Sequence, residues 1–320
     1  MEGTLEGKYL RQSLKVRSWE RAEKKIREME EGGQSQRITL EHACESFIQD
    51  ARSRGLRPPS LYKYELLFRR LKDFAKNEGF AYLSQFDLET LRKFRATWQH
   101  KNFAARNKTE NLRALFRFSH DAGWLKENPA KKLKSPKITS TPTQPFTRTE
   151  FARILKACDG YRGRNAELLK AFVLLLRYSG LRIRDAVTLR QDAVVDGKLF
   201  LHSAKTGVPV RLPLPPDCLE ALATIGTSER FFWSAEGLPK TRVANFQTML
   251  ASLFKSAGIV SGYAHRFRDT FAVELLLAGI PLDRVAVLLG NTVKVADRHY
   301  APWVRARQEQ LEDDVRKTWK

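Results

Sequence analysis

The stretch His265-Arg-Phe-Arg-Asp-Thr-Phe-Ala-Val-Glu-Leu-Leu-Leu277 joins a basic beginning to a run of large apolar residues. Three of its apolar side chains recur at the spacing of one helical face: Phe271, Leu275 and Leu276. This spacing predicts a helix that packs one side against a core. His265 and Arg268 open the helix, so the stretch predicts a core helix with two polar side chains near its beginning.

Further polar motifs lie on both sides of this stretch. Leu288-Leu-Gly-Asn291 follows it, and Tyr300 comes next, near the beginning of a final helical stretch. Upstream, Ser179-Gly-Leu-Arg182 places an arginine just after a glycine that ends a helix, with one leucine between them, at a turn from which a guanidinium projects. Between these motifs, Lys205 occupies the tip of a predicted hairpin. Four separated places in the C-terminal half thus carry side chains suited to chemistry.

The rest of the C-terminal half reads as helices with one small sheet. Thr147-Arg-Thr-Glu150 fits a capping box and predicts a helix from there. A strongly apolar helix is expected over residues 166–178, ended by Gly180. Residues 198–203 and 208–213 alternate like the strands of a hairpin with one buried face. After Cys218 helices are expected up to Lys320, with breaks at Gly262, Gly279, Gly290 and Pro302.

Residues 38–137 predict an all-helical domain. Apolar residues at helical spacing predict one helix from Leu40 to Gly55 and a second from after Ser60 to Gly79. A third helix is expected after Asp87, a suitable N-cap, and a fourth carries Leu112, Leu115, Phe116 and His120 before Gly123. Four short helices around one core predict a compact bundle.

Two segments flank this bundle. Residues 1–37 form a basic N-terminal arm that is expected to be helical from residue 8; it is either a solvated helix or an arm that contacts DNA or a neighbouring subunit. Residues 131–145 contain three prolines and four lysines, and we place a basic linker at residues 138–145. The second domain then covers residues 146–320.

Charge and composition limit the class of partner. The chain has 320 residues with 57 Lys and Arg against 36 Asp and Glu, a net charge of +21 and a pI near 10.0. Residues 1–140 hold 30 basic and 18 acidic residues, and the remainder hold 27 and 18, so both halves are cationic. This split predicts a polyanion gripped by two domains.

Other features narrow the expected location. No run approaches the roughly 18 apolar residues of a membrane span, and no secretory signal is recognisable. Three scattered cysteines, Cys44, Cys158 and Cys218, predict neither a disulfide framework nor a paired-cysteine zinc site. We therefore expect a cytoplasmic protein, associated with the nucleoid, that takes no small-molecule substrate and does not contact a membrane.

The polar motifs together resemble the catalytic domain of the tyrosine recombinases, the phage integrase family. The family's residues appear in its order and with its spacing: Arg182, Lys205, His265, Arg268, Asn291 and Tyr300. The resemblance spans about residues 145–310, and the four-helix segment is similar to the family's SAM-like core-binding domain. It implies a mainly α fold with a small β-sheet or hairpin, in which a helical core-binding domain and a mixed α+β catalytic domain form a C-shaped clamp.

The resemblance also implies roles for these residues. Tyr300 is the expected nucleophile, which leaves a 3′-phosphotyrosyl link and a free 5′ hydroxyl. Arg182 and Arg268 are expected to stabilise the charge on the phosphate, because guanidiniums donate bidentately. Lys205 is the expected general acid, and His265 either shares the tyrosine proton or hydrogen-bonds the phosphate. The resemblance also implies a reaction that needs no metal, no ATP and no cofactor.

Three positions require separate treatment. Asn291 replaces the family's second histidine; its amide still donates a hydrogen bond but cannot relay a proton. Asp185 is expected to support the arginines rather than to react. Asp269 follows Arg268 where many relatives carry histidine, and we assign it no role.

We therefore predict a site-specific DNA recombinase or integrase that acts on double-stranded DNA. It is expected to be a homotetramer on DNA and a monomer or dimer off DNA. Two alternatives remain: a DNA relaxase like the type IB topoisomerases, and a weakly active or inactive DNA-binding protein, for which Asn291 is the support. The helix after Tyr300 either folds back on its own domain or docks on a neighbouring subunit.

Overall fold

The computed structural model describes residues 2–5, 8–11, 19, 22–23, 38–99, 103–136, 144–161, 163–225, 229–234 and 236–319. The chain divides into two units, Met1–Ser140 and Thr141–Lys320. Most of the arm expected at residues 1–37 and most of the linker expected at 138–145 lie outside the described residues. Within the arm, β1 (Glu2–Leu5) pairs antiparallel with β2 (Lys8–Arg11). The prediction of a helix from residue 8 is therefore wrong for Lys8–Arg11, because main-chain pairing with Glu2–Leu5 overrides the local helix propensity.

The first unit is the predicted helical bundle. Its helices are α2 (Leu40–Ser53), α3 (Pro58–Asn77), α4 (Leu88–Ala96) and α5 (Phe103–Asp121), with a short 3-10 turn, η1, at Leu83–Gln85. Asp87 caps α4 as expected: its Oδ1 accepts from the Thr90 N–H at 2.7 Å. α3 begins three residues earlier than predicted because Pro58 and Pro59 suit the first turn, where no N–H is needed.

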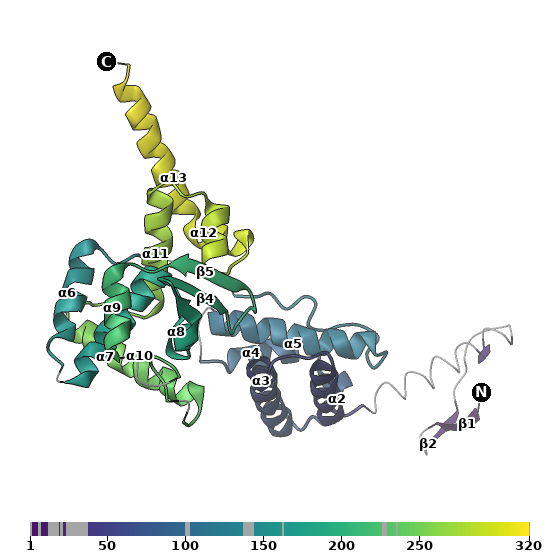
Figure 1. Ribbon diagram of the computed structural model, residues 1–320. Helices are drawn as coiled ribbons and strands as arrows, with labels where there is room; N and C mark the ends of the chain where they lie inside the picture. Colours follow the sequence, from purple (N-terminus) through teal and green to yellow (C-terminus); the bar gives the residue numbers. More distant parts are fainter. Residues whose placement is uncertain are drawn as a thin grey trace. The chain divides into compact units, whose positions relative to one another are not determined.

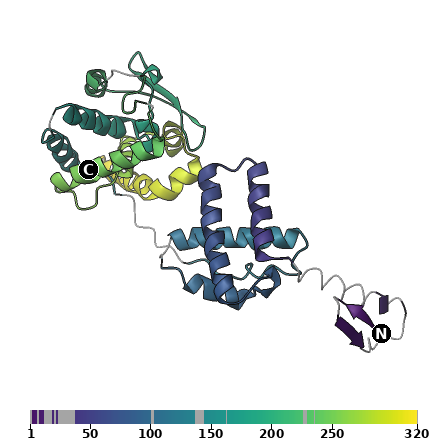
Figure 2. The same ribbon diagram turned by 90° about the horizontal axis from the view of Figure 1, so that it is seen from below.

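The bundle closes around one apolar core. α2 and α3 lie side by side, and α5 runs across both of them (Figures 1 and 2). Phe47, Leu71, Leu91 and Phe116, one from each helix, are almost fully buried. Each helix buries one face of an amphipathic sequence, which is how a short helix gains stability in water.

The second unit is a helical domain with one small antiparallel sheet, in the order β3 (Val194–Val195), β4 (Lys198–His202) and β5 (Pro209–Pro213). Its helices are α6 (Arg148–Cys158), α7 (Arg164–Ser179), α8 (Ile183–Val187), α9 (Pro216–Ile225), α10 (Pro239–Ser256), α11 (His265–Leu277), α12 (Leu282–Leu288) and α13 (Val293–Lys317), with a 3-10 turn, η2, at Gln191–Ala193. The fold class predicted from the sequence, mainly α with a small sheet, is confirmed.

The hairpin predicted at residues 198–213 is present. β4 pairs with β5 in a register that puts Leu199 opposite Leu212 and Leu201 opposite Val210. Leu199, Val210 and Leu212 are buried on one face, as the alternation predicts. The third strand, β3, was not predicted, because two residues are too few to show alternation.

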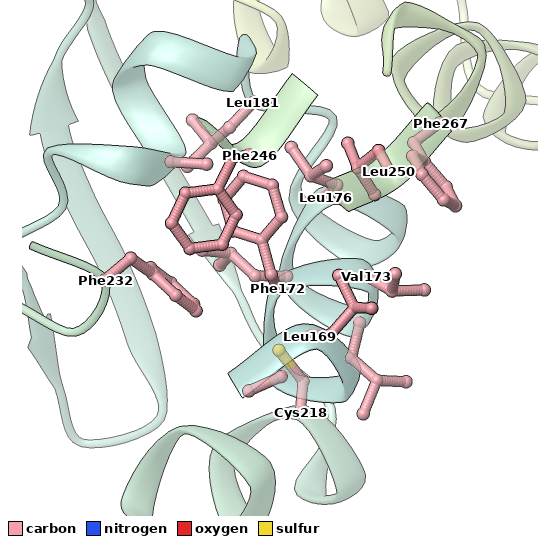
Figure 3. Packing of buried hydrophobic residues seen from close by; sticks show 14 of the residues in the cluster. Leu169, Phe172, Val173, Leu176, Leu181, Cys218, Phe232, Phe246, Leu250 and Phe267 are labelled. Carbon is pink, nitrogen blue, oxygen red and sulfur yellow. The ribbon is translucent and has the colours of Figure 1, made fainter. Parts of the chain in front are cut away.

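The core of this unit is centred on α7 (Figure 3). Residues 171–176 are buried without a break, so this helix is covered on all sides. The Phe172 ring lies 4.2 Å from that of Phe246 and 5.0 Å from that of Phe232, measured between centroids. A second, smaller core joins α11, α12 and α13, which lie together in Figure 1; it includes Val273, Val285, Leu289 and Tyr300.

The end of the chain differs from the sequence prediction. Pro302 was expected to break the helix but lies inside α13, which continues to Lys317. A proline removes one main-chain donor, and the charged residues after it sustain the helix through pairs such as Arg316 with Asp313, at 2.8 Å.

The three cysteines are buried and form no disulfide. Burial raises the pKa of the Cys44, Cys158 and Cys218 thiols to about 12. Among the described residues, every helix is too short or too polar to cross a membrane.

Candidate active site

Arg182 is placed by the turn that ends α7. Gly180 has φ of 59° and ψ of 20°, a left-handed conformation that glycine adopts without strain. A Cβ at this position would lie 2.7 Å from the Phe271 ring of α11, so the close approach of the two helices also requires glycine. The chain then reverses into α8, with Arg182 at its N-cap. The turn thereby directs the Arg182 guanidinium toward the hairpin and the end of α12.

The Arg182 guanidinium joins two distant segments. It donates to Ser203 Oγ at 3.1 Å, at the end of β4, and to Asn291 Oδ1 at 2.7 Å, after α12. Because the Asn291 oxygen accepts from Arg182, the amide nitrogen of Asn291 keeps its N–H donors for another partner. The structure therefore brings Arg182 and Asn291 together, as the sequence prediction requires.

Asp185 holds the hairpin. This buried carboxylate accepts from the Ala204 N–H at 2.8 Å and from Ser203 Oγ at 3.2 Å. Lys205 follows directly, exposed in the turn between β4 and β5. Asp185 thus supports Arg182 through Ser203 and fixes the base of the turn that carries Lys205.

Arg268 is held by the main chain. It is 3% exposed, and two of its five N–H groups donate to Gly180 O and Leu289 O, each at 2.7 Å. Burial, and then the positive charge of Arg182, lowers the Arg268 pKa to about 10, so the side chain stays cationic near neutral pH. Two guanidiniums close enough to influence each other's ionisation form a site for an anion.

The hydroxyl of Tyr300 donates a hydrogen bond to Asp269. Tyr300 is 2% exposed, and its Oη donates to Asp269 Oδ1 at 3.0 Å. Burial raises the pKa of Tyr300, the Asp269 carboxylate raises it further, and the charges of Arg268 and Arg182 act in the opposite direction. Tyr300 therefore lies within the field of both guanidiniums and is a neutral phenol at physiological pH.

Sequence reasoning missed Asp269. It gave no role to this residue, yet the carboxylate contacts the predicted nucleophile directly. One signal was available: Asp269 stands four residues after His265 and so shares its helix face. Burial raises the Asp269 pKa to about 6, against the lowering effects of the Tyr300 hydrogen bond and the Arg268 charge.

His265 lies at the open edge of the site. Its side chain is 56% exposed, and Nε2 is 3.9 Å from Asp269 Oδ1, beyond hydrogen-bond length. Partial burial, followed by the charges of Arg268 and Arg182, lowers the His265 pKa to about 4. Lys205 contributes to the same lowering, which puts the hairpin tip within electrostatic reach of His265. The imidazole is therefore neutral at pH 7.

The residues predicted from the sequence thus gather around two guanidiniums and a phenol. Such a set can bind a phosphodiester, offer hydrogen bonds to its non-bridging oxygens, and present a hydroxyl nucleophile to the phosphorus. In the part of the chain that the structure describes, no group of three or more His, Cys, Asp or Glu side chains is arranged to hold a metal ion.

Comparison with known proteins gives a consistent assignment. The model of the phage integrase family matches residues 144–301, which contain all of the residues discussed above. The tyrosine recombinase XerA of Thermococcus kodakarensis is 28% identical over 190 residues, which are 57% of this chain and 64% of that protein. The tyrosine recombinase XerC of Oceanobacillus iheyensis is 24% identical over 237 residues, covering 68% of this chain and 77% of that protein. The chain thus spans just under two thirds of the XerA relative.

Solved structures share the fold. A lambda integrase dimer, residues 75–356, bound to a COC′ core site has a TM-score of 0.64 at 20% identity, covering 79% of this chain and 95% of that one. The Tn1549 transposon integrase in complex with circular intermediate DNA has a TM-score of 0.63 at 16% identity, covering 85% and 99%. The family model, the relatives and the shared fold agree, and residues 144–301 form a domain of the phage integrase family, the family of the tyrosine recombinases.

Proposed function

We propose that the chain is a site-specific DNA recombinase that cleaves and rejoins duplex DNA through a 3′-phosphotyrosyl intermediate. The observation that carries this proposal is the buried hydroxyl of Tyr300, which is hydrogen-bonded to Asp269 and lies close enough to Arg182 and Arg268 for both charges to act on its ionisation. The relatives are named tyrosine recombinases, and the solved neighbours are integrases bound to DNA, which supports the same function.

The chemistry follows from the placement of the side chains. Arg182 and Arg268 donate to the non-bridging oxygens, where negative charge grows as the phosphorus becomes five-coordinate. Tyr300 Oη attacks the phosphorus, and the bond between phosphorus and the 5′ oxygen breaks. Lys205, on the hairpin, gives the departing oxygen its proton. Attack by a 5′ hydroxyl on the phosphotyrosyl link reverses these steps, so the energy of the phosphodiester is kept in the covalent link.

Asn291 and His265 complete the phosphate site in this proposal. The Arg182 contact fixes the Asn291 oxygen, so the amide nitrogen is the group that faces a bound phosphate. The neutral His265 ring has one N–H to donate, at the exposed edge of the site. We assign both residues to hydrogen bonding of the phosphate, which makes Asn291 a working replacement for a histidine.

The basic surface of both halves supports DNA as the partner. Most of the 57 Lys and Arg residues have the role of binding the phosphate backbone, so affinity for DNA falls steeply with salt. We propose that the two units close around the duplex as a clamp and that four copies assemble on two DNA sites. Solved relatives of the same fold include a dimer on a core site and a tetramer on a Holliday junction.

The test is the capture of the covalent intermediate. A DNA substrate with a nick beside the cleavage point loses its short 5′-hydroxyl fragment, which traps the phosphotyrosyl link. The native chain is expected to give a protein–DNA adduct in a denaturing gel, and Tyr300→Phe is expected to give none. Tyr178→Phe, which keeps a ring on the same unit outside the site, is the matched control and is expected to retain the adduct.

Two results would contradict the proposal. An adduct that persists in Tyr300→Phe would show that another residue is the nucleophile. Relaxation of supercoiled plasmid by isolated monomers, without exchange of strands between sites, would favour the topoisomerase-like alternative.

A further inference from the structure

The contact between Asp269 and Tyr300 is the starting point. The distance from Tyr300 Oη to Asp269 Oδ1 is 3.0 Å, and the two residues are 2% and 5% exposed. A carboxylate removed from water to this extent costs free energy unless it is paired or hydrogen-bonded. The Tyr300 hydroxyl is a hydrogen-bond donor to it, so the contact joins the attacking oxygen to a proton acceptor.

The other candidate acceptor is less well placed. The His265 side chain is 56% exposed, and its Nε2 lies 3.9 Å from the same carboxylate oxygen. Partial burial, and then the surrounding positive charges, lower the His265 pKa to about 4, which makes the imidazole a weak base. Asp269 accepts the hydrogen bond of the Tyr300 hydroxyl and has the greater affinity for a proton.

We propose that Asp269 is the general base of DNA cleavage: its carboxylate takes the phenolic proton of Tyr300 as the phenol oxygen attacks. This inference rests on the proposed recombinase function and deepens it. Asp269 touches the reacting atom and is therefore a catalytic residue in this scheme. The role would account for a buried acid at a position where no function was expected from the sequence.

The step balances as follows. Tyr300 Oη supplies an electron pair to phosphorus while its proton moves to Asp269 Oδ1, which becomes a neutral carboxylic acid. The bond from phosphorus to the 5′ oxygen breaks, and that oxygen takes a proton from Lys205. During rejoining the 5′ hydroxyl returns its proton to the Lys205 amine, and Asp269 returns the other proton to the phenol. No oxidant, reductant or further reactant takes part.

Burial, opposed by the charges around Asp269, sets its working pH. The groups that face it or act on its ionisation come from α11, α13 and the segment before α11: Tyr263, His265, Arg266, Arg268 and Tyr300. Burial raises the Asp269 pKa to about 6 despite Arg268 and Arg266. Only the deprotonated carboxylate accepts a proton, so cleavage is expected to fall as the pH drops through about 6.

The experiment compares two substrates under single-turnover conditions. Both are nicked duplexes; one has the natural 5′ oxygen at the cleavage point, and the other has a bridging 5′ sulfur. A thiolate is a better leaving group than an alkoxide and departs without a proton. The sulfur substrate therefore removes the need for the general acid and leaves the need for the base.

Asp269→Asn keeps the shape and the hydrogen-bond acceptor but cannot take the proton. It is expected to slow adduct formation about 100-fold or more on both substrates and to lose the pH dependence near 6. Lys205→Ala is expected to be slow on the oxygen substrate and restored on the sulfur substrate. Asp283→Asn, an exposed residue on α12, is the control for the change in net charge and is expected to behave as the native chain.

The outcomes separate the two proposals. No adduct from the native chain would contradict the recombinase function itself. With an adduct that needs Tyr300, the base assignment is overturned if Asp269→Asn reacts as fast as the native chain, reacts faster, or keeps the pH dependence. His265→Gln gives a second test that does not depend on the folding of Asp269→Asn: loss of the dependence near pH 6 in this variant would assign the base to His265.

Discussion

The two sides of the candidate site are built differently. The α11 side consists of Arg268, Asp269 and Tyr300, all almost fully buried and fixed by main-chain carbonyls, by packing or by one another. The hairpin side consists of Arg182, Asp185 and Lys205, where Arg182 is held by two side chains and Lys205 is exposed in a turn. The α11 side is thus part of the buried core, and the hairpin side is part of a surface loop.

This difference assigns different tasks to the two sides. A guanidinium that donates to main-chain carbonyls cannot turn without moving a helix, so in the proposed reaction Arg268 would offer a fixed charge to the phosphate. A guanidinium that is held by a serine and an asparagine can rearrange when a stronger acceptor arrives. We therefore expect the α11 side to set the geometry of attack, and the hairpin side to adjust to the DNA.

The largest expected effect is the loss of adduct formation when either arginine is replaced. Arg182→Ala and Arg268→Ala are both expected to abolish adduct formation, because each removes a donor to the phosphate. Their stabilities should differ: Arg268→Ala leaves two buried carbonyls without donors and is expected to lower the free energy of unfolding by about 3 kcal/mol, against about 1 kcal/mol for Arg182→Ala. Urea-induced unfolding measures both values. Equal losses would show that the two sides are equally fixed.

The next effect concerns Asn291. Asn291→Asp keeps an oxygen for Arg182 but replaces the amide donor with a second, negatively charged oxygen. Adduct formation is expected to fall by about 100- to 1,000-fold, while the free energy of unfolding changes little. Asn291→His, whose ring also carries an N–H donor, is the matched comparison and is expected to retain activity. A large gain of strand exchange in Asn291→His would mean instead that the native amide is a poor donor.

A smaller effect is expected when the hydrogen bonds that hold the hairpin are removed. Asp185→Ala removes the acceptor of the Ala204 N–H and of Ser203 Oγ, so the turn that carries Lys205 loses its anchor. We expect adduct formation to slow by up to about 100-fold and the Ala204 amide to exchange with solvent faster. Hydrogen exchange followed by mass spectrometry of the hairpin peptide measures the second effect. Unchanged exchange would mean that the hairpin does not depend on the Asp185 carboxylate.

The smallest effect is on the pH dependence of stability. The folded-state pKa of His265, about 4, lies below its usual 6.5, so the unfolded chain binds the extra proton and stability falls as pH drops through this window. The folded-state pKa of Asp269, about 6, lies above its usual 3.8, so the folded chain holds the extra proton and stability rises as pH drops from about 6 to 3.8. The two contributions oppose each other in the native chain.

A variant that lacks one of the two titrating groups should show the pH dependence of stability that the other group causes. Asp269→Asn is expected to lose stability more steeply than the native chain between pH 7 and pH 5, and His265→Gln less steeply. Urea unfolding at the two pH values checks the order of the three proteins. The reverse order would show that the assigned direction of at least one of the two pKa shifts is wrong.

Much of the fold follows from local sequence. The capping box of Thr147 and Glu150, the left-handed Gly180 and the cap at Asp87 each specify an element boundary through interactions over a few residues. The hairpin follows from alternation alone. The secondary structure at Pro302 and at Lys8–Arg11 was predicted wrongly. Neighbouring residues decide whether a proline ends a helix, and strand pairing decides whether a polar stretch is helical.

The candidate site also has a part that the sequence predicts and a part that it does not. The structure brings together the six residues expected from the motif order. The helix, the hairpin and the turns that carry them could also be predicted from the sequence. The contacts of Arg182 with Asn291, and of Tyr300 with Asp269, join residues 109 and 31 positions apart, and no local pattern specifies them. Asp269 had no assigned role in the motif, and the position of the Tyr300 hydroxyl reveals what its carboxylate contacts.

The buried cysteines have a practical consequence for studying DNA binding. Thiols with a pKa of about 12 are almost entirely protonated at pH 7, and the side chains lie inside the two cores, so maleimide dyes will react with them slowly. New cysteines at exposed positions, Tyr62→Cys in the first unit and Leu238→Cys in the second, are therefore expected to label selectively in the otherwise native chain. Energy transfer between two dyes at these positions would test, one molecule at a time, the proposal that the units close around a duplex.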